Sequence, residues 1–227
     1  PSLICFFFFL LHIWISFSAF MSKNSLTFLL FGVVLFLLVF TFFRIGQPRV
    51  LSVEEMKVNG FIKYGTSNKL RDFSLEDHFG AKFSQQSLKD KKLNLLYFGY
   101  TTCPSECPVM MSVMRQVYDK IDTNNIAYYL ITFDPEIDTQ QRLKSYVTAF
   151  NKNFVGVSGT KSEISKLGFQ LGINKLDPEI DHNSQRIIEH TNHLVVVGND
   201  SKIIGVFRPP FDSNSMSLVI KSLLRSN

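Results

Sequence analysis

Apolar and polar positions divide the chain into two unlike regions. Residues 1–43 carry a single charged side chain, Lys23, whereas the remainder has the mixed pattern of an ordinary soluble domain. Within the first region, residues 26–43 contain no charge. As a helix this run would extend about 27 Å, close to the thickness of a bilayer core. We therefore expect a membrane anchor at residues 21–46 and a linker at residues 47–69.

A second apolar run, residues 3–20, precedes the first by about five residues, so two spans would need a very tight hairpin. Met21 followed by Ser22 and Lys23 would make an ordinary start before one span. We expect residues 1–20 to be an apolar extension outside the mature protein, with a genuine second span as the alternative. With one span, Lys23 would lie inside and the following domain outside.

From residue 70 onward, short apolar runs alternate with amphipathic segments. The runs predict buried strands at residues 93–100, 126–133 and 154–157, and the segments between them predict helices at 109–121, 139–150 and 160–171. A hairpin at residues 70–84 comes before them, and two strands and a helix follow at 193–197, 202–207 and 216–224. Strands that alternate with helices predict a parallel sheet covered on both faces. The order fits an α/β, thioredoxin-like domain over residues 70–227.

Charge and cysteine content narrow the function. The net charge of +5 is spread over single Lys and Arg residues, and no basic block interleaved with aromatic residues supports nucleic acid binding. Three cysteines are too few for a disulfide-stapled scaffold. Cys5 lies in the apolar N-terminus and is most simply a small hydrophobic residue. Redox or metal chemistry is therefore expected at the other two cysteines, Cys103 and Cys107.

Cys103 and Cys107 follow the predicted strand 93–100 and lie at the start of the predicted helix. Backbone N–H groups at a helix N-terminus favour thiolate, and the i, i+4 spacing lets the two sulfurs approach each other. The pair can close a disulfide or share a metal ion. Two unrelated buried cysteines would be the alternative, which the turn-like Pro-Ser-Glu between them disfavours.

Three kinds of chemistry compete for such a pair. Structural zinc needs four ligands. A redox dithiol needs only the two sulfurs, although C-x-x-C is its usual spacing. Copper(I) prefers soft thiolates, and an imidazole can complete its shell.

The histidines bear on this choice. His12 lies in the apolar segment, while His78 in a turn and His182 in a polar stretch are expected to be solvated. His190 and His193 precede a buried strand that, in a thioredoxin fold, approaches the cysteine loop. We prefer His190, because His193 begins the strand and can point to either face.

Four segments carry a family resemblance over residues 70–224. The most specific, YFGYTTCPSECP, resembles the F-G-[FY]-T-x-C-P-x-x-C-P signature of the Sco/SenC family of cytochrome c oxidase assembly proteins. The others are DFSLEDHFGAKFS, ITFDPEIDT and EHTNHLVVVGND. The resemblance implies copper ligands at Cys103, Cys107 and His190. Thr102 departs from the histidine of many members, and Glu189 replaces their aspartate.

The resemblance implies a membrane-anchored copper chaperone that assists assembly of the dinuclear copper centre in cytochrome c oxidase subunit II. It would be single-pass in an inner membrane, with its soluble domain in the periplasm or the mitochondrial intermembrane space. The alternative is a thiol–disulfide oxidoreductase that keeps the subunit II cysteines reduced through Cys103 and Cys107, so enzymatic activity stays open. A peroxiredoxin-like peroxidase is a third hypothesis, but it expects an arginine near the cysteine, and only Arg115 is near.

Overall fold

The computed structural model describes residues 25–45, 50–65, 68–121, 124–175, 179–180 and 186–226. It forms two compact units, residues 1–49 and 50–227. The apolar extension predicted for residues 1–20 lies outside the described residues, as do Cys5, His12 and His182.

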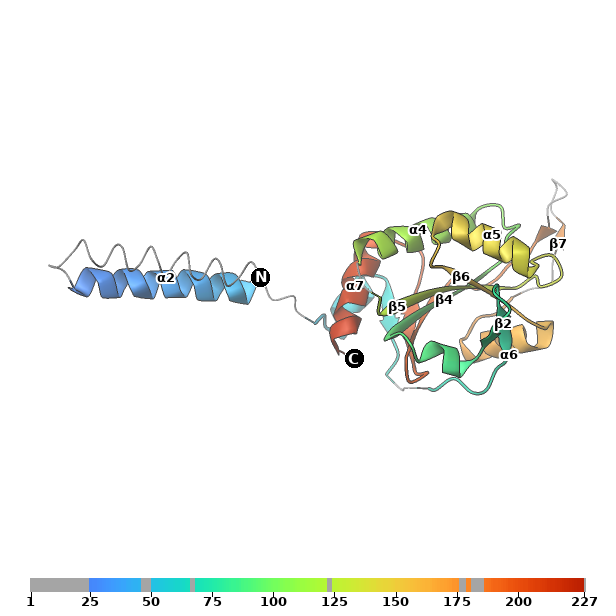
Figure 1. Ribbon diagram of the computed structural model, residues 1–227, viewed down its shortest axis with the longest axis horizontal. Coiled ribbons are helices and arrows are strands. Elements are labelled where there is room, and N and C mark those ends of the chain that lie inside the picture. The colour runs from blue at the N-terminus through green and yellow to red at the C-terminus, as the bar shows by residue number, and fades with distance from the viewer. Residues whose placement is uncertain are drawn as a thin grey trace. The chain divides into compact units, whose positions relative to one another are not determined.

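Helix α2 (Ser25–Ile45) is the described element of the first unit (Figure 1), and its apolar side chains, such as Phe36 and Phe42, are exposed. Among the described residues, no helix has the length and apolarity that a membrane crossing requires. The membrane anchor predicted for residues 21–46 stays a prediction.

The second unit is built on one eight-stranded sheet in the order β1-β10-β9-β4-β5-β6-β2-β3. Strand β4 runs parallel to β5, and β5 runs parallel to β6, whereas the other neighbours are antiparallel. The strands are β1 (Phe61–Lys63), β2 (Leu75–Asp77), β3 (Lys82–Phe83), β4 (Leu93–Gly99), β5 (Ile126–Thr132), β6 (Val155–Ser158), β9 (Leu194–Gly198) and β10 (Ile203–Phe207). A separate two-stranded hairpin pairs β7 (Glu179–Ile180) with β8 (Arg186–Ile187). The predicted parallel core with a closing antiparallel pair is confirmed.

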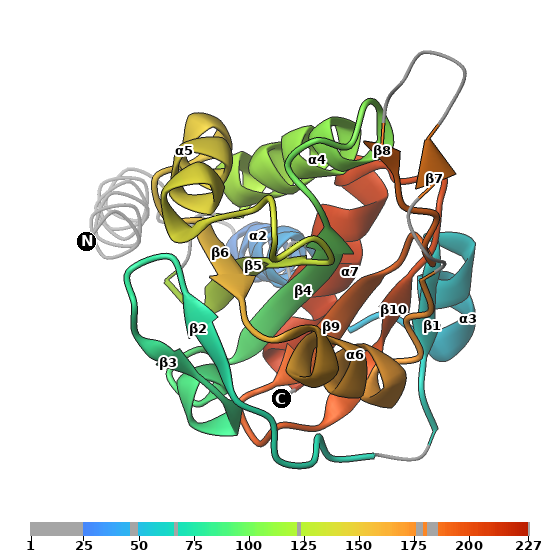
Figure 2. The ribbon, with the colours of Figure 1, turned by 90° about the vertical axis from the view of Figure 1, so that its right-hand side faces the viewer.

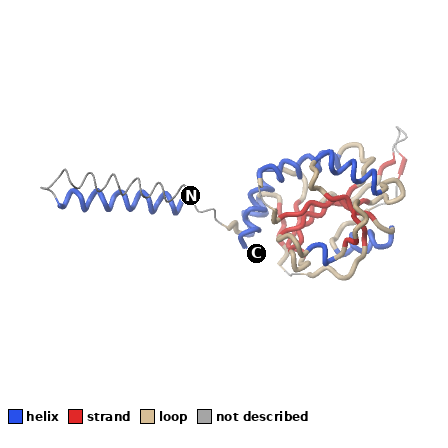
Figure 3. Tube along the Cα trace, in the orientation of Figure 1, coloured by secondary structure: helices blue, strands red, loops and turns tan. Residues whose placement is uncertain are grey.

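Helices cover both faces of this sheet, as Figures 2 and 3 show. They are α3 (Val53–Val58), α4 (Glu106–Lys120), α5 (Gln140–Phe150), α6 (Lys161–Gln170) and α7 (Ser213–Ser226), with a short 3-10 helix at Gln85–Leu88. Successive side chains of a strand point to opposite faces: Gly99 faces Cys107 of α4, whereas Phe98 faces Gly168 of α6. All seven residues of β4 are buried for this reason. The cysteine loop therefore starts from a strand that is buried along its whole length.

The stretch expected to be a linker, residues 47–69, holds α3 and β1. Strand β1 extends the sheet by pairing Phe61 with Phe207 of β10. Met56 and Phe61 are both buried in the core, which explains why this weakly patterned segment packs onto the domain. A capping box between Ser52 and Glu55 starts the short helix.

The hairpin expected at residues 70–84 is shorter than predicted. Its first strand begins only at Leu75, and residues 70–74 form no strand. Strand β2 pairs on its other side with β6 through Glu76 and Asp77. This pairing is long-range, so the local alternation of residues 70–75 could not locate it.

Candidate metal and redox site

Cys103 and Cys107 lie in the turn after β4 and in the first turn of α4, and both are free thiols. The Cys107 N–H donates a hydrogen bond to the Cys103 Sγ at 3.4 Å. The structure thus brings the two sulfurs together at a helix start, as the spacing predicts. They are unequally accessible, however: Cys103 is half-buried, whereas Cys107 is 0% exposed. An incoming molecule meets Cys103 first.

The two thiols also differ in acidity. The pKa of Cys103 is lowered, first because the Cys107 thiol hydrogen-bonds to its sulfur, and then because backbone N–H groups at the start of α4 point to it; burial opposes this shift. The pKa of Cys107 is raised by its hydrogen bond to Cys103, by burial and by the Cys103 charge. Of the two thiols, Cys103 is therefore the more acidic.

Gly99 makes room for the buried sulfur. A Cβ atom at this position would lie 2.9 Å from the Cys107 Sγ and 3.2 Å from side-chain atoms of Leu130 and Tyr97. Such a separation from sulfur is far inside van der Waals contact. Glycine is thus the residue that lets Cys107 pack against the end of β4.

Asp138 anchors the turn that leads to the cysteines. Its buried carboxylate accepts hydrogen bonds from the Thr101 N–H at 3.0 Å and the Thr132 hydroxyl at 2.6 Å, and a third from the Thr101 hydroxyl. Arg142 Nε donates to the Thr101 Oγ1 at 2.7 Å. The N-cap of α5 is Thr139 rather than Asp138. Asp138 holds the loop in place, a role visible only once β5 and the loop are adjacent.

His190 lies on the loop before β9 and is half-buried. Its ring centroid is 5.0 Å from that of Phe133 and 6.4 Å from those of Tyr97 and Tyr100. The Nδ1 atom is 3.1 Å from the Thr191 carbonyl oxygen. Because a carbonyl can only accept, Nδ1 carries the proton and donates, which leaves the lone pair on Nε2. This is the tautomer of a histidine prepared to bind a metal through Nε2.

His190 and Cys103 line one cavity of about 350 Å³, together with Tyr100 and Glu189. In the part of the chain that the structure describes, however, no group of three or more His, Cys, Asp or Glu residues is arranged to hold a metal ion. The structure therefore joins the two sulfurs and places His190 beside the cavity of Cys103 without closing a three-ligand shell. Two sulfurs and an imidazole are a donor set that fits copper(I).

The other predicted histidines lie elsewhere. His78 was expected to be solvated, but it is only 5% exposed, and its Nδ1 accepts the Gly156 N–H at 2.9 Å. His193 has a lowered pKa, caused by burial and then by the charge of Arg208. Neither belongs to the cavity of Cys103.

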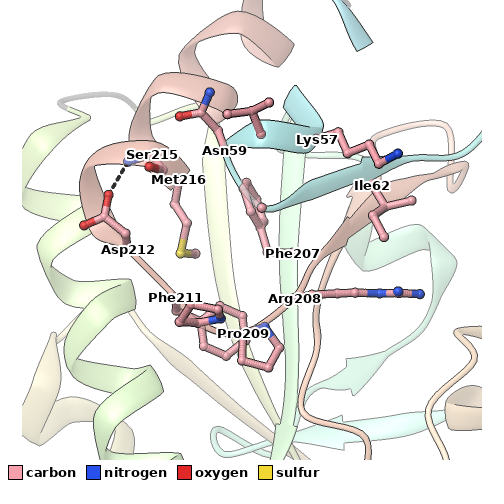
Figure 4. A pocket seen from close by; sticks show the side chains of 13 residues that line it. Lys57, Asn59, Ile62, Phe207, Arg208, Pro209, Phe211, Asp212, Ser215 and Met216 are labelled. Carbon is pink, nitrogen blue, oxygen red and sulfur yellow. Dashed lines mark hydrogen bonds between the residues drawn. The ribbon is translucent and has the colours of Figure 1, made fainter. Parts of the chain in front are cut away.

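A second cavity of about 280 Å³ lies between α3, the end of β10 and the start of α7 (Figure 4). Phe207 and Met216 contribute apolar side chains, and Lys57 and Arg208 contribute positive charge. It contains neither cysteine and no histidine. It is separate from the site that the sequence predicts.

The fold and the site define a class: a thioredoxin-like protein whose central strand delivers two adjacent thiols, one of them acidic, to a cavity shared with an imidazole. The particular family follows from comparison with known proteins. The SCO1/SenC family model matches residues 63–225, so the chain belongs to the SCO1/SenC family.

Curated relatives agree with this membership. A protein of Stutzerimonas stutzeri whose name describes it as copper-binding is 29% identical over 153 residues, which cover 66% of this chain and 74% of the relative. The human mitochondrial SCO1 homolog is 30% identical over 139 residues, which cover 60% of this chain but only 46% of the human protein.

Solved structures support the fold. Bradyrhizobium japonicum ScoI, solved with copper bound, has a TM-score of 0.61 and 25% identity, and the match covers 70% of this chain and 99% of that one. BsSco, described as a member of the Sco family of cytochrome c oxidase assembly proteins with a disulfide switch, has a TM-score of 0.57 and 20% identity, covering 73% and 99%. The predicted thioredoxin-like fold is thereby confirmed.

Proposed function

We propose that this protein binds copper through Cys103, Cys107 and His190 and passes it on during assembly of cytochrome c oxidase. The single observation that carries the proposal is the cavity that Cys103 shares with His190; the Cys103 Sγ also accepts a hydrogen bond from the Cys107 N–H. Copper bound to related proteins, and the stated role of BsSco in oxidase assembly, support it.

The three proposed ligands differ in how they would hold and release the copper ion. Cys103 supplies a stabilised thiolate at the cavity wall, and the tautomer of His190 supplies a free Nε2 lone pair. Cys107 lies behind them and is fully buried. Thiolates of an acceptor would therefore displace Cys103 and His190 first and Cys107 last, in successive ligand exchanges. Both sulfurs must be reduced for the ion to bind.

The acceptor in this proposal is subunit II of cytochrome c oxidase, at its dinuclear copper centre. A second candidate function is a thiol–disulfide oxidoreductase that reduces the subunit II cysteines. The unequal acidity of Cys103 and Cys107 favours it, because an acidic thiol beside a buried one suits disulfide exchange. The two functions differ in whether His190 is needed.

The location forms part of the proposal: a single-pass inner-membrane protein with residues 70–227 in the periplasm or the mitochondrial intermembrane space. Its support is the uncharged run at residues 26–43 and the mitochondrial setting of the human relative. We expect the full chain to float with lipid vesicles in a density gradient, and residues 50–227 to remain in the dense fraction. Equal flotation of the full chain and of residues 50–227 would contradict the proposed membrane anchoring.

Copper binding by variants tests the ligand set. We expect Cys103→Ser and Cys107→Ser to lose copper(I) binding, and His190→Ala to weaken it at least tenfold, in competition with a chromogenic chelator. His193→Ala is the matched control, because His193 lies outside the cavity, and it should bind like the wild type. Wild-type affinity in His190→Ala would overturn the three-ligand proposal, and retained disulfide exchange in that variant would favour the oxidoreductase.

A further inference from the structure

Two tyrosine hydroxyls connect the cysteine loop with the loop that carries His190. Tyr97 lies on β4 and is 0% exposed. Its hydroxyl donates to the Asn192 Oδ1 at 3.1 Å and lies 3.9 Å from the Cys107 Sγ. A tyrosine hydroxyl has a single proton, so the shorter contact to Asn192 takes it. Tyr97 thus ties the residue two positions after His190 to the neighbourhood of the buried sulfur.

Tyr100 makes the corresponding connection on the other side of His190. Its side chain is 1% exposed, and its hydroxyl accepts the Ile188 N–H at 3.0 Å. The Tyr100 carbonyl accepts the Cys103 N–H at 3.3 Å, and both residues line the cavity that they share with His190. Tyr100 therefore ties the residue two positions before His190 to the residue that carries the accessible sulfur.

The rings of the same two tyrosines also contact the imidazole. Both meet the His190 ring edge-on, with centroids 6.4 Å apart in each pair. Elsewhere the loop is held by Asn174, whose carbonyl accepts the Thr191 N–H at 2.8 Å. That bond fixes the loop to the domain but not to the sulfurs. The tyrosine hydroxyls supply the link between the histidine loop and the cysteines.

We propose that Tyr97 and Tyr100 are positioning residues, whose hydroxyls hold the His190 loop against the cysteine loop so that the imidazole can reach the sulfurs. The copper-dependent part of this inference rests on the function proposed above, whereas its metal-free part does not. Phenylalanine would fill the same ring volume in both places. A buried hydroxyl is costly unless it is hydrogen-bonded, and these two are bonded to opposite ends of one five-residue loop segment, Ile188 to Asn192.

The test compares Tyr97→Phe, Tyr100→Phe and the double variant with Tyr128→Phe. Tyr128 is a matched control, because it is a buried strand tyrosine whose hydroxyl has no hydrogen-bond partner among the described residues. In the reduced, metal-free protein, amide hydrogen exchange followed by NMR should be faster by about fivefold or more at Ile188 in Tyr100→Phe, since one hydrogen bond is lost. Tyr128→Phe should leave it unchanged.

The copper-loaded protein provides the second measurement. Copper(I) affinity should fall about fivefold in each single variant, the value for one net hydrogen bond, and further in the double variant. Nitrogen hyperfine coupling from His190 in the copper(II) form should weaken, a change that a general loss of stability would not produce. Thermal unfolding checks that each variant is folded.

The two measurements separate the possible failures. Unchanged exchange at Ile188 in Tyr100→Phe overturns the positioning role, whatever the copper result. A wild-type protein that binds no copper would instead overturn the proposed function, and the exchange data would still decide whether the hydroxyls hold the loop.

Discussion

At the scale of single residues, Gly99 shows how little space surrounds the buried sulfur. A Cβ atom at this position would lie against the Cys107 Sγ and against side-chain atoms of Leu130 and Tyr97. None of these atoms belongs to a flexible surface side chain, so an added methyl group forces a shift in the core.

We expect Gly99→Ala to destabilise the protein by about 1–3 kcal/mol, the usual cost of overpacking, and to displace Cys107. Urea unfolding would measure the loss, and the rate of thiol alkylation would report the displaced sulfur. Gly65→Ala is the control, since a Cβ there meets nothing within 4 Å. A Gly99→Ala protein as stable as this control would show that the site tolerates the methyl group.

At the scale of elements, His78 joins β2 to β6. Its backbone N–H donates to the Gly156 carbonyl at 2.8 Å, and its Nδ1 accepts the Gly156 N–H at 2.9 Å. Protonation would place a hydrogen on Nδ1 and break the second bond. The pKa of His78 is accordingly lowered, mainly by burial and to a smaller extent by Lys144, while Asp77 opposes the shift.

This lowered pKa predicts a pH-dependent stability. The unfolded chain has the ordinary histidine pKa of 6.5 and takes up the proton first, so stability is complete above that pH and falls as the pH drops below it. We expect the urea midpoint to decrease from pH 7.5 to 5.5, and His78→Gln to flatten this dependence. His193→Gln should remove a separate part of the pH dependence of stability, because the pKa of His193 is lowered too. Equal slopes for wild type and His78→Gln would contradict the assignment.

At the scale of the whole molecule, the sulfurs join the end of β4 to α4, and the histidine loop joins both to β9. An ion bound by the two sulfurs and the histidine loop would link parts of the fold that are far apart in sequence. Binding that favours the folded state adds stability by mass action, about 2.7 kcal/mol at a free ligand concentration 100 times Kd.

We therefore expect saturating copper(I) to raise the melting temperature of the reduced protein by roughly 5–10 °C, from this stabilisation and the usual entropy of unfolding. Differential scanning calorimetry would measure it. Protein oxidised to the Cys103–Cys107 disulfide is the control and should show no increase, because its sulfurs lack thiolate lone pairs for the ion. An equal increase in both forms would place the ion elsewhere.

Several parts of this protein followed from local patterns. The strands β4 and β5 are short apolar runs and the helices α4 and α5 are amphipathic, and the spacing of Cys103 and Cys107 indicated that their sulfurs approach each other. His190 shares a cavity with Cys103, and its role as a ligand stays a prediction. In contrast, α3 and β1 were missed, because their few apolar residues become informative only when paired with β10.

The sequence by itself determined the thioredoxin-like order of elements and the adjacency of Cys103 and Cys107, because hydrophobic patterns and residue spacing are local properties. Only the tertiary structure decided that Cys107 is sealed beneath Cys103, that Asp138 holds the Thr101 turn, and that Tyr97 and Tyr100 reach the His190 loop. Each of these depends on side chains from different strands meeting in space, and their distances are set by the packing of the sheet rather than by separation along the chain.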